Sequence, residues 1–152
     1  MRQFFAQNVT EVLSHCVDGR FHHALHIVAR CLPALHVGID GDIVAPLVQQ
    51  GVYDRAILIC GTGAGMSVVA NKFKGVYAVA CEGVYSAKMA RAINNANILC
   101  MGGWIVGPEM AVEMTKTFLA TEWCQDLEDW RAANMHKFAK QVSAIEDKIY
   151  DK

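Results

Sequence analysis

The residues best suited to chemistry form one run, Cys60-Gly61-Thr62-Gly63-Ala64-Gly65, at the end of an apolar segment. Glycine at every second position lets a backbone turn tightly and point several N–H groups in one direction, so the run can form a nest for an anion. A helix starting after the turn would add partial positive charge. The same field would favour the thiolate form of Cys60, which is a base or a nucleophile.

Four interpretations fit this run. A dinucleotide fingerprint would need a third glycine where Met66 stands, although Glu82 lies at a suitable distance. A cysteine hydrolase would need a histidine partner, and His136 is the only histidine after residue 41. In a proton-transfer enzyme, Cys60 would take a proton next to a carbonyl while the nest binds the enediolate. In the fourth interpretation the glycines form a turn around an inert, buried thiol.

Alternating strand and helix patterns from residue 42 onward would position this run. The predicted strands cover 55–60, 76–81 and 97–101, and the predicted helices cover 42–51, 66–72, 85–94 and 108–121. In the first helix, Pro46 would fit the first turn. Short apolar strands linked by helices predict an α/β fold, a three-layer sandwich with a mostly parallel, Rossmann-like sheet. Ligands bind beyond the carboxyl ends of such strands, where Cys60, Glu82 and Gly102 fall.

The two ends of the chain differ from this regular middle. Residues 126–150 predict a long helix with apolar residues at mostly three- and four-residue steps, packed either on its own sheet or across a subunit interface. Residues 1–41 show no convincing strand followed by a glycine turn, and fit helices at 7–15 and 21–32.

Histidines are concentrated before residue 41, where His22, His23 and His26 could share a helix face. No carboxylate or paired cysteine supports a metal site there, so we expect no metal. The unusual composition of this segment would also fit a shift of reading frame in the gene, a hypothesis that a continuous frame on resequencing would overturn.

Composition excludes several classes of protein. The 152 residues suit one domain over 1–152, and a net charge of −1 without a basic helix face argues against nucleic acid as a partner. No apolar stretch reaches the roughly 20 residues that span a membrane, and the start lacks the pattern of a signal peptide. Six cysteines without a C-x-x-C pair indicate reduced thiols, so we expect a cytoplasmic protein.

Further motifs accompany the Cys60 run in a specific order. They are Ile57-Leu58-Ile59 before it, then Met66-Ser67, Ala70-Asn71-Lys72, Tyr85-Ser86-Ala87, Arg91, Asn94, Ala96-Asn97 and Gly107-Pro108-Glu109. Together they resemble the type B ribose-5-phosphate isomerase and galactose-6-phosphate isomerase family over roughly residues 42–125. Residues 1–41 are atypical of that family, and 126–152 would be its C-terminal helix.

The resemblance implies conversion of an aldose phosphate to a ketose phosphate, such as ribose 5-phosphate to ribulose 5-phosphate, through an enediolate without metal or cofactor. It assigns Cys60 and Thr62 to catalysis and the backbone of Gly61, Thr62, Gly63, Ala64 and Gly65 to the anion hole. It matches Asn94 to an amide that binds substrate hydroxyls, and Arg131 to an arginine that binds phosphate, often across a dimer. We therefore expect a homodimer or homotetramer. Asn94 could instead be a helix cap, Arg131 a solvated helix residue, and Asn71 is interpreted as structural.

Three departures from the family pattern bear on activity. The Asp-His pair of the family's first strand is not found, Ile93 stands where many members have a ring-opening histidine, and Leu127 matches a second phosphate arginine. The alternative function is therefore a non-catalytic or impaired sugar-phosphate-binding protein of the same fold.

Overall fold

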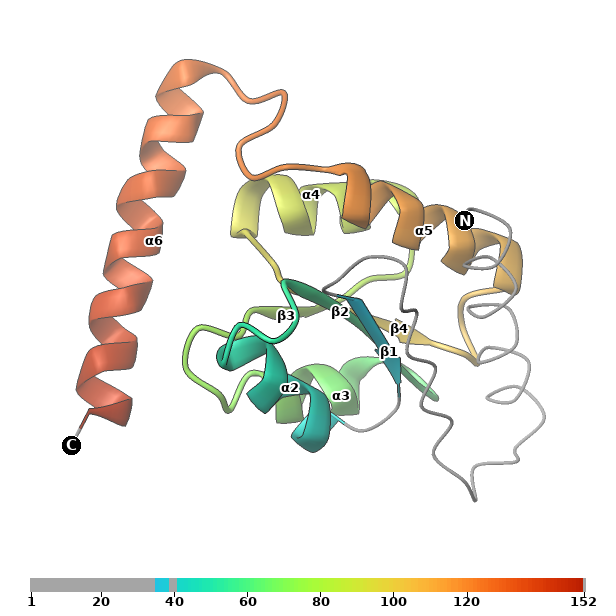
Figure 1. The fold of residues 1–152 in the computed structure, drawn as a ribbon. Helices are drawn as coiled ribbons and strands as arrows, with labels where there is room; N and C mark the ends of the chain where they lie inside the picture. The colour runs from blue at the N-terminus through green and yellow to red at the C-terminus, as the bar shows by residue number, and fades with distance from the viewer. Residues whose placement is uncertain (1–34, 39–40, 152) are drawn as a thin grey trace.

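The computed structural model describes residues 35–38 and 41–151. This part of the chain forms one parallel sheet in the order β1-β2-β4-β3, with α2 and α3 on one face and α4 and α5 on the other (Figure 1). The strands are β1 (Leu35–Gly38), β2 (Arg55–Cys60), β3 (Ala78–Ala80) and β4 (Ile98–Gly102). The helices are α2 (Gly41–Gln49), α3 (Ala64–Ala70), α4 (Val84–Asn94), α5 (Pro108–Ala120) and α6 (Asp129–Tyr150). The predicted three-layer α/β architecture and long C-terminal helix are confirmed.

Alternate residues of β2 pack into two separate cores. Ile57 and Ile59 face the layer of α4 and α5, where Phe118 is fully buried. Ala56 and Leu58 face the other layer, beside Val44 of α2. Burial of a large apolar side chain contributes about 1.5–3 kcal/mol relative to an exposed one. A strand buried on both faces must be apolar throughout, which is why residues 56–59 have no polar member.

The observed boundaries correct two expectations for the chain before β2. The strand β1 pairs in parallel with β2 from Leu35 opposite Arg55 onward, so the expectation of no strand before residue 42 is wrong. Four residues are too few to show a periodic pattern. The helix α2 begins at Gly41, which places Pro46 inside the helix and not in its first turn. The proposed helices at 7–15 and 21–32, and the three histidines, lie outside the described residues.

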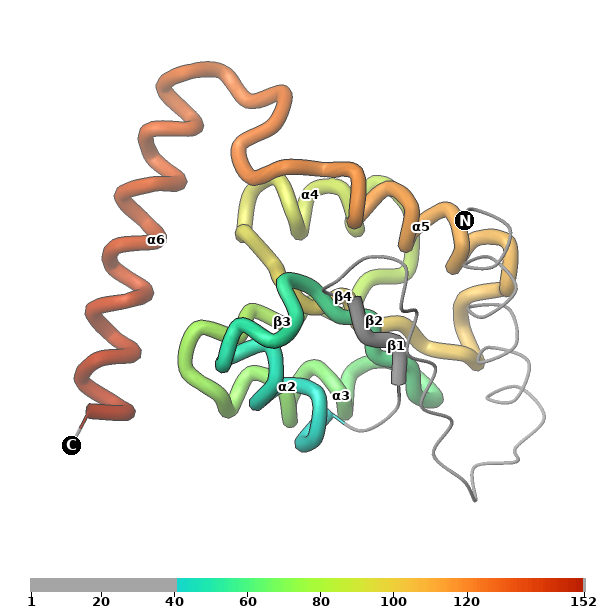
Figure 2. The backbone as a smooth tube through the Cα atoms, viewed as in Figure 1, coloured from blue at the N-terminus to red at the C-terminus, as the bar shows by residue number. Residues whose placement is uncertain are grey.

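The helix α6 lies at the outside of the described chain, along the side of the sheet where β3 is the edge strand (Figure 2). It begins at Asp129 and not at 126, because Cys124 and Asp126 adopt left-handed backbone conformations with φ of 63° and 58°. No residue of α6 is buried. Its apolar side chains, among them Phe138 and Ile145, are largely exposed.

Polar groups attach α6 to the edge of the sheet. The carboxylate of Glu146 accepts hydrogen bonds from the Gly75 N–H at 3.0 Å and from the Tyr77 hydroxyl at 3.1 Å. One turn further along, Asp151 pairs with the Lys74 ammonium at 2.7 Å. Burial and the nearby Glu146 carboxylate raise the pKa of Tyr77 to about 12. Tyr77 is therefore a protonated donor over the whole neutral range.

This attachment predicts a loss of stability in alkali. An unfolded tyrosine loses its proton near pH ~10, whereas Tyr77 in the folded chain keeps its proton to a higher pH. From about pH 10 to 12 the unfolded state therefore binds fewer protons, and the free energy of unfolding falls as pH rises. Tyr77→Phe should make this fall shallower in urea titrations, while Tyr85→Phe, at an exposed position, should leave it unchanged. Equal slopes in the parent and Tyr77→Phe would contradict the assignment.

Candidate functional site

The chain after β2 makes a tight turn that holds the Cys60 thiol. The Gly63 N–H donates a hydrogen bond to Cys60 Sγ at 3.1 Å, and Gly63 has a φ of +80°, in the left-handed region that favours glycine. Helix α3 starts at the next residue, Ala64, which is two residues earlier than predicted. The thiol is half-buried and the side chain of Thr62 is exposed.

The turn packs on the end of β4 with no side chain between the two backbones. A Cβ at Gly63 would lie 2.9 Å from the Met101 carbonyl carbon, and one at Gly102 would lie 2.7 Å from the Thr62 carbonyl carbon. The Gly103 N–H also donates to the Cys60 carbonyl at 2.8 Å. By contrast, a Cβ at Gly65 would meet nothing within 4 Å. The fold therefore explains glycine at 63 and 102, and it leaves open space at 65.

This open space lies beside backbone donors. First-turn N–H groups of a helix have no acceptor inside the helix, and those of α3 include the one on Gly65. Because α3 has only seven residues, the donors available here are local N–H groups and not the dipole of a long helix. A thiol next to donors with room for a ligand can remove a proton from carbon while the donors accept the resulting oxyanion.

Two neighbouring thiols are poor alternatives to Cys60. Cys81 and Cys100 are buried, and burial raises the pKa of each, that of Cys100 to about 12. Both are therefore neutral thiols near pH 7. Cys124 is half-buried but lies just after α5, where its N–H donates to the Ala92 carbonyl at 2.9 Å.

Asn94 lies near the amino ends of the strands, whereas Cys60 lies at the carboxyl end of β2. It is the last residue of α4, which runs back from the carboxyl ends of the strands to their amino ends. Asn97, just beyond it, accepts from the Tyr77 N–H at 2.8 Å at the start of β3. Asn94 precedes Ile98, and Ile98 pairs with Ala56 at the start of β2. Cys60 lies four residues beyond Ala56 along the strand, which is about 13 Å at strand spacing. One chain does not bring Asn94 to the Cys60 turn.

Arg131, like Asn94, lies at the amino-terminal end of the sheet, away from Cys60. It is exposed in the first turn of α6, with its guanidinium 5.9 Å from the centroid of the Trp130 ring. The segment leading to α6 crosses the end of α4, where the Cys124 N–H donates a hydrogen bond to the Ala92 carbonyl.

The residue that caps the C-terminus of α4 is Asn95, in a left-handed conformation with φ of 52°, and not Asn94.

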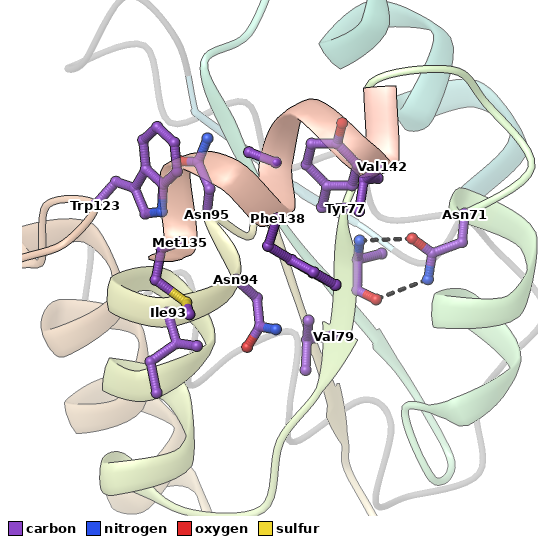
Figure 3. Close-up of a pocket in the computed structure, with 12 residues that line it drawn as sticks. Asn71, Tyr77, Val79, Ile93, Asn94, Asn95, Trp123, Met135, Phe138 and Val142 are labelled. Atoms are coloured by element: carbon purple, nitrogen blue, oxygen red, sulfur yellow. Dashed lines mark hydrogen bonds between the residues drawn. The ribbon is translucent and has the colours of Figure 1, made fainter. Parts of the chain in front are cut away.

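A cavity of about 220 Å³ lies between α6 and the end of α4 (Figure 3). Asn94 points into it, and Ile93 lines it beside Met135. Phe138 reaches across it from α6 toward Val79. The cavity therefore contains Asn94 but none of the Cys60 turn.

Asn71 is a structural residue, as expected. Its side-chain amide donates to the Ala78 carbonyl at 2.7 Å and accepts from the Ala78 N–H at 2.8 Å. Both bonds hold the end of α3 to the start of β3.

Two residues at the Cys60 turn were not predicted to shape it. The sequence pattern places Gly102 only at the end of a strand and gives Trp104 no role. The signal for both was an aromatic residue two positions after a glycine at a strand end.

Within residues 35–38 and 41–151, no group of three His, Cys, Asp or Glu side chains could hold a metal ion. Over the same residues, no helix is both long and apolar enough to cross a membrane.

Comparison with known proteins identifies similar chains. The Ribose/Galactose Isomerase family matches residues 40–136. A 4-deoxy-4-sulfo-D-erythrose isomerase of Clostridium sp. (strain MSTE9) is 53% identical over 110 residues, covering 72% of this chain and 69% of that protein. A D-erythrulose-4-phosphate isomerase of Pectobacterium atrosepticum is 42% identical over 80 residues, so this chain spans only 53% of its length. The structure of Clostridium thermocellum ribose-5-phosphate isomerase B matches with a TM-score of 0.65 at 31% identity, covering 94% of this chain and 92% of that chain.

The glycines of the turn allow a matched pair of substitutions. Gly63→Ala forces an unfavourable φ and a backbone clash with Met101, so it should lower the free energy of unfolding by about 1–3 kcal/mol. Gly65→Ala adds a methyl group to open space within a helix and should raise it by about 0.5–1 kcal/mol. Urea unfolding followed by circular dichroism measures both. A similar loss in the two variants would show that this turn is assigned wrongly.

Proposed function

Because the chain belongs to the ribose/galactose isomerase family, we propose that it interconverts an aldose and a ketose that carry an anionic group, by a metal-independent route through an enediolate. The observation that carries this proposal is the Cys60 thiol, hydrogen-bonded by the Gly63 N–H and lying beside the open space at Gly65. These features provide a base, donors for an oxyanion and room for a ligand.

In the proposed mechanism, the Cys60 thiolate removes the proton on C2 of the open-chain aldose. The electron pair of that bond forms the C1–C2 double bond, and the carbonyl π electrons move to O1. The backbone of the 61–65 turn stabilises the negative charge on O1. The Cys60 thiol then returns the proton to C1, while the exposed Thr62 hydroxyl relays a proton from O2 to O1. A positioned base of this kind contributes about 10²–10⁴-fold in rate.

We propose a four-carbon substrate. An aldose closes a five-membered ring through its C4 hydroxyl, and a four-carbon aldose substituted at C4 has no such hydroxyl. Such a substrate is open-chain, so it needs no ring-opening acid, and Ile93 stands where the family resemblance places a ring-opening histidine. The similarity to a 4-deoxy-4-sulfo-D-erythrose isomerase and to a D-erythrulose-4-phosphate isomerase supports the same substrate size.

The number of matched arginines supports a substrate with a single negative charge. The resemblance places one anion-binding arginine at Arg131 and replaces a second with Leu127, which is half-buried. A sulfonate carries one negative charge, whereas a phosphate ester carries about 1.5–2 at pH 7. One arginine is the better match for a sulfonate, so we propose 4-deoxy-4-sulfo-D-erythrose as the preferred aldose.

We further propose that the site is completed by a second copy of the chain, in a homodimer. Asn94 and Arg131 lie near the amino ends of the strands and Cys60 at the carboxyl end of β2. One substrate therefore cannot contact all three within one chain. The exposed apolar residues of α6, such as Phe138 and Ile145, would be covered in the dimer.

The function is tested with a panel of aldoses. Purified protein is mixed with 4-deoxy-4-sulfo-D-erythrose, D-erythrose 4-phosphate or D-ribose 5-phosphate, and ketose formation is measured. We expect kcat/KM for the sulfo sugar to exceed that for ribose 5-phosphate by at least about tenfold. Cys60→Ala should lower kcat by about 10²–10⁴-fold, and Cys81→Ala should leave it nearly unchanged.

Other outcomes of the panel are equally informative. A preference for ribose 5-phosphate would overturn the four-carbon substrate, and loss of activity in Cys81→Ala alone would overturn Cys60 as the base and direct attention to Glu82. Binding without turnover in the parent would favour the non-catalytic sugar-binding protein.

The shared site is tested by mixing two inactive variants. Cys60→Ala and Asn94→Ala should each be inactive alone. Coexpressed chains would form mixed dimers in which one of the two sites has an intact Cys60 and an intact Asn94. We expect about a quarter of the parental activity, because half of the dimers are mixed and each has one good site. Coexpressed Cys60→Ala and Thr62→Ala, which alter the same half of the site, are the control and should remain inactive. Sedimentation as a strict monomer would rule out this arrangement.

A further inference from the structure

The indole of Trp104 lies directly against the Cys60 turn. The Trp104 N–H donates to the Gly61 carbonyl at 3.0 Å, which places the residue just beyond the end of β4. A Cβ at Gly61 would lie 2.8, 2.9 and 3.0 Å from Cζ3, Cε3 and Cδ2 of the Trp104 ring. These three carbons are consecutive, and an approach to the ring edge would make the middle one distinctly the nearest. The six-membered ring therefore covers Gly61 with its face.

The placement of this side chain differs from that of its neighbours. Every residue of β4 is buried and Val106 is 3% exposed, whereas Trp104 is 68% exposed. Most of its large apolar surface is thus presented to solvent, next to a thiol and a set of oxyanion donors. Exposed aromatic rings of this kind are common in the lining of ligand pockets.

An aldose presents two kinds of surface to a site. Its hydroxyl and carbonyl oxygens need donors and acceptors, and its carbon chain presents C–H groups that pack on an aromatic face. The turn at 61–65 supplies backbone donors for oxygen. Trp104 supplies an apolar surface over Gly61, next to those donors. Its ring also occupies space at the entrance to the site.

We infer that Trp104 is a specificity-determining residue of this site, which packs against the carbon chain of the bound aldose and limits its length. The inference rests on the proposed isomerase function, because it assigns the chain held at the Cys60 turn to a sugar. It also accounts for Gly61, since any side chain there would displace the ring.

The test compares Trp104→Ala and Trp104→Phe with the parent, with separate kcat and KM values for D-erythrose 4-phosphate and D-ribose 5-phosphate. Removal of the ring should raise KM for the four-carbon substrate about tenfold with little change in kcat, and should lower the four- to five-carbon ratio of kcat/KM about tenfold. Trp104→Phe should restore most of the ratio. Ile105→Ala, at a 49% exposed apolar neighbour, is the matched control and should keep the parental ratio.

A binding measurement separates this inference from the proposed function. In the Cys60→Ala background, D-erythrose 4-phosphate should change the tryptophan fluorescence, and the change should be lost when Trp104→Phe is added. If the parent isomerises no aldose but this signal is present, the function fails and the Trp104 contact stands. Unchanged ratios in Trp104→Ala, or dissociation of that variant to monomers with an equal loss for all substrates, would overturn the inference.

Discussion

The contact on which this site depends is one between two stretches of backbone. The turn at 61–63 lies on the end of β4 so closely that neither Gly63 nor Gly102 has room for a Cβ. This contact sets the direction of the chain as it leaves β2, and with it the position of the Cys60 thiol and of the first N–H groups of α3. It also carries Trp104 over Gly61. A thiol that is positioned through backbone packing needs no second side chain to orient it.

The sheet supplies the rigidity that this contact requires. Both β2 and β4 are buried on their two faces, and their register sets Cys60 opposite Gly102. A shift of one residue would exchange the two faces of the strand and remove Ile57 and Ile59 from their core. The chemistry at the rim is therefore fixed by apolar packing in the centre of the fold.

Much of this arrangement could be predicted from the sequence, and the rest could not for identifiable reasons. The apolar run ending at Cys60 predicts β2 with its observed bounds, because a strand buried on both sides has a simple pattern. The strand β1 is too short to show one. The separation of Asn94 from Cys60 was available in principle, since a helix that follows a parallel strand returns to the opposite edge. A motif match identifies Asn94 but does not show at which end of the strands it lies. For Trp104 the sequence offers only its position two residues after Gly102, and the contact with Gly61 shows where its ring lies.

The attachment of α6 divides the protein into two parts of unequal local stability. The polar attachments of the helix, through Glu146, Asp151 and their partners, lie at the surface, where water and dissolved ions compete for the same groups. The body is held by side chains such as Phe118 that solvent cannot reach. Local opening of α6 exposes no fully buried side chain of its own, whereas opening of the sheet exposes both cores at once. The chain thus has two free energies of opening, a small one for the helix and a larger one for the sheet.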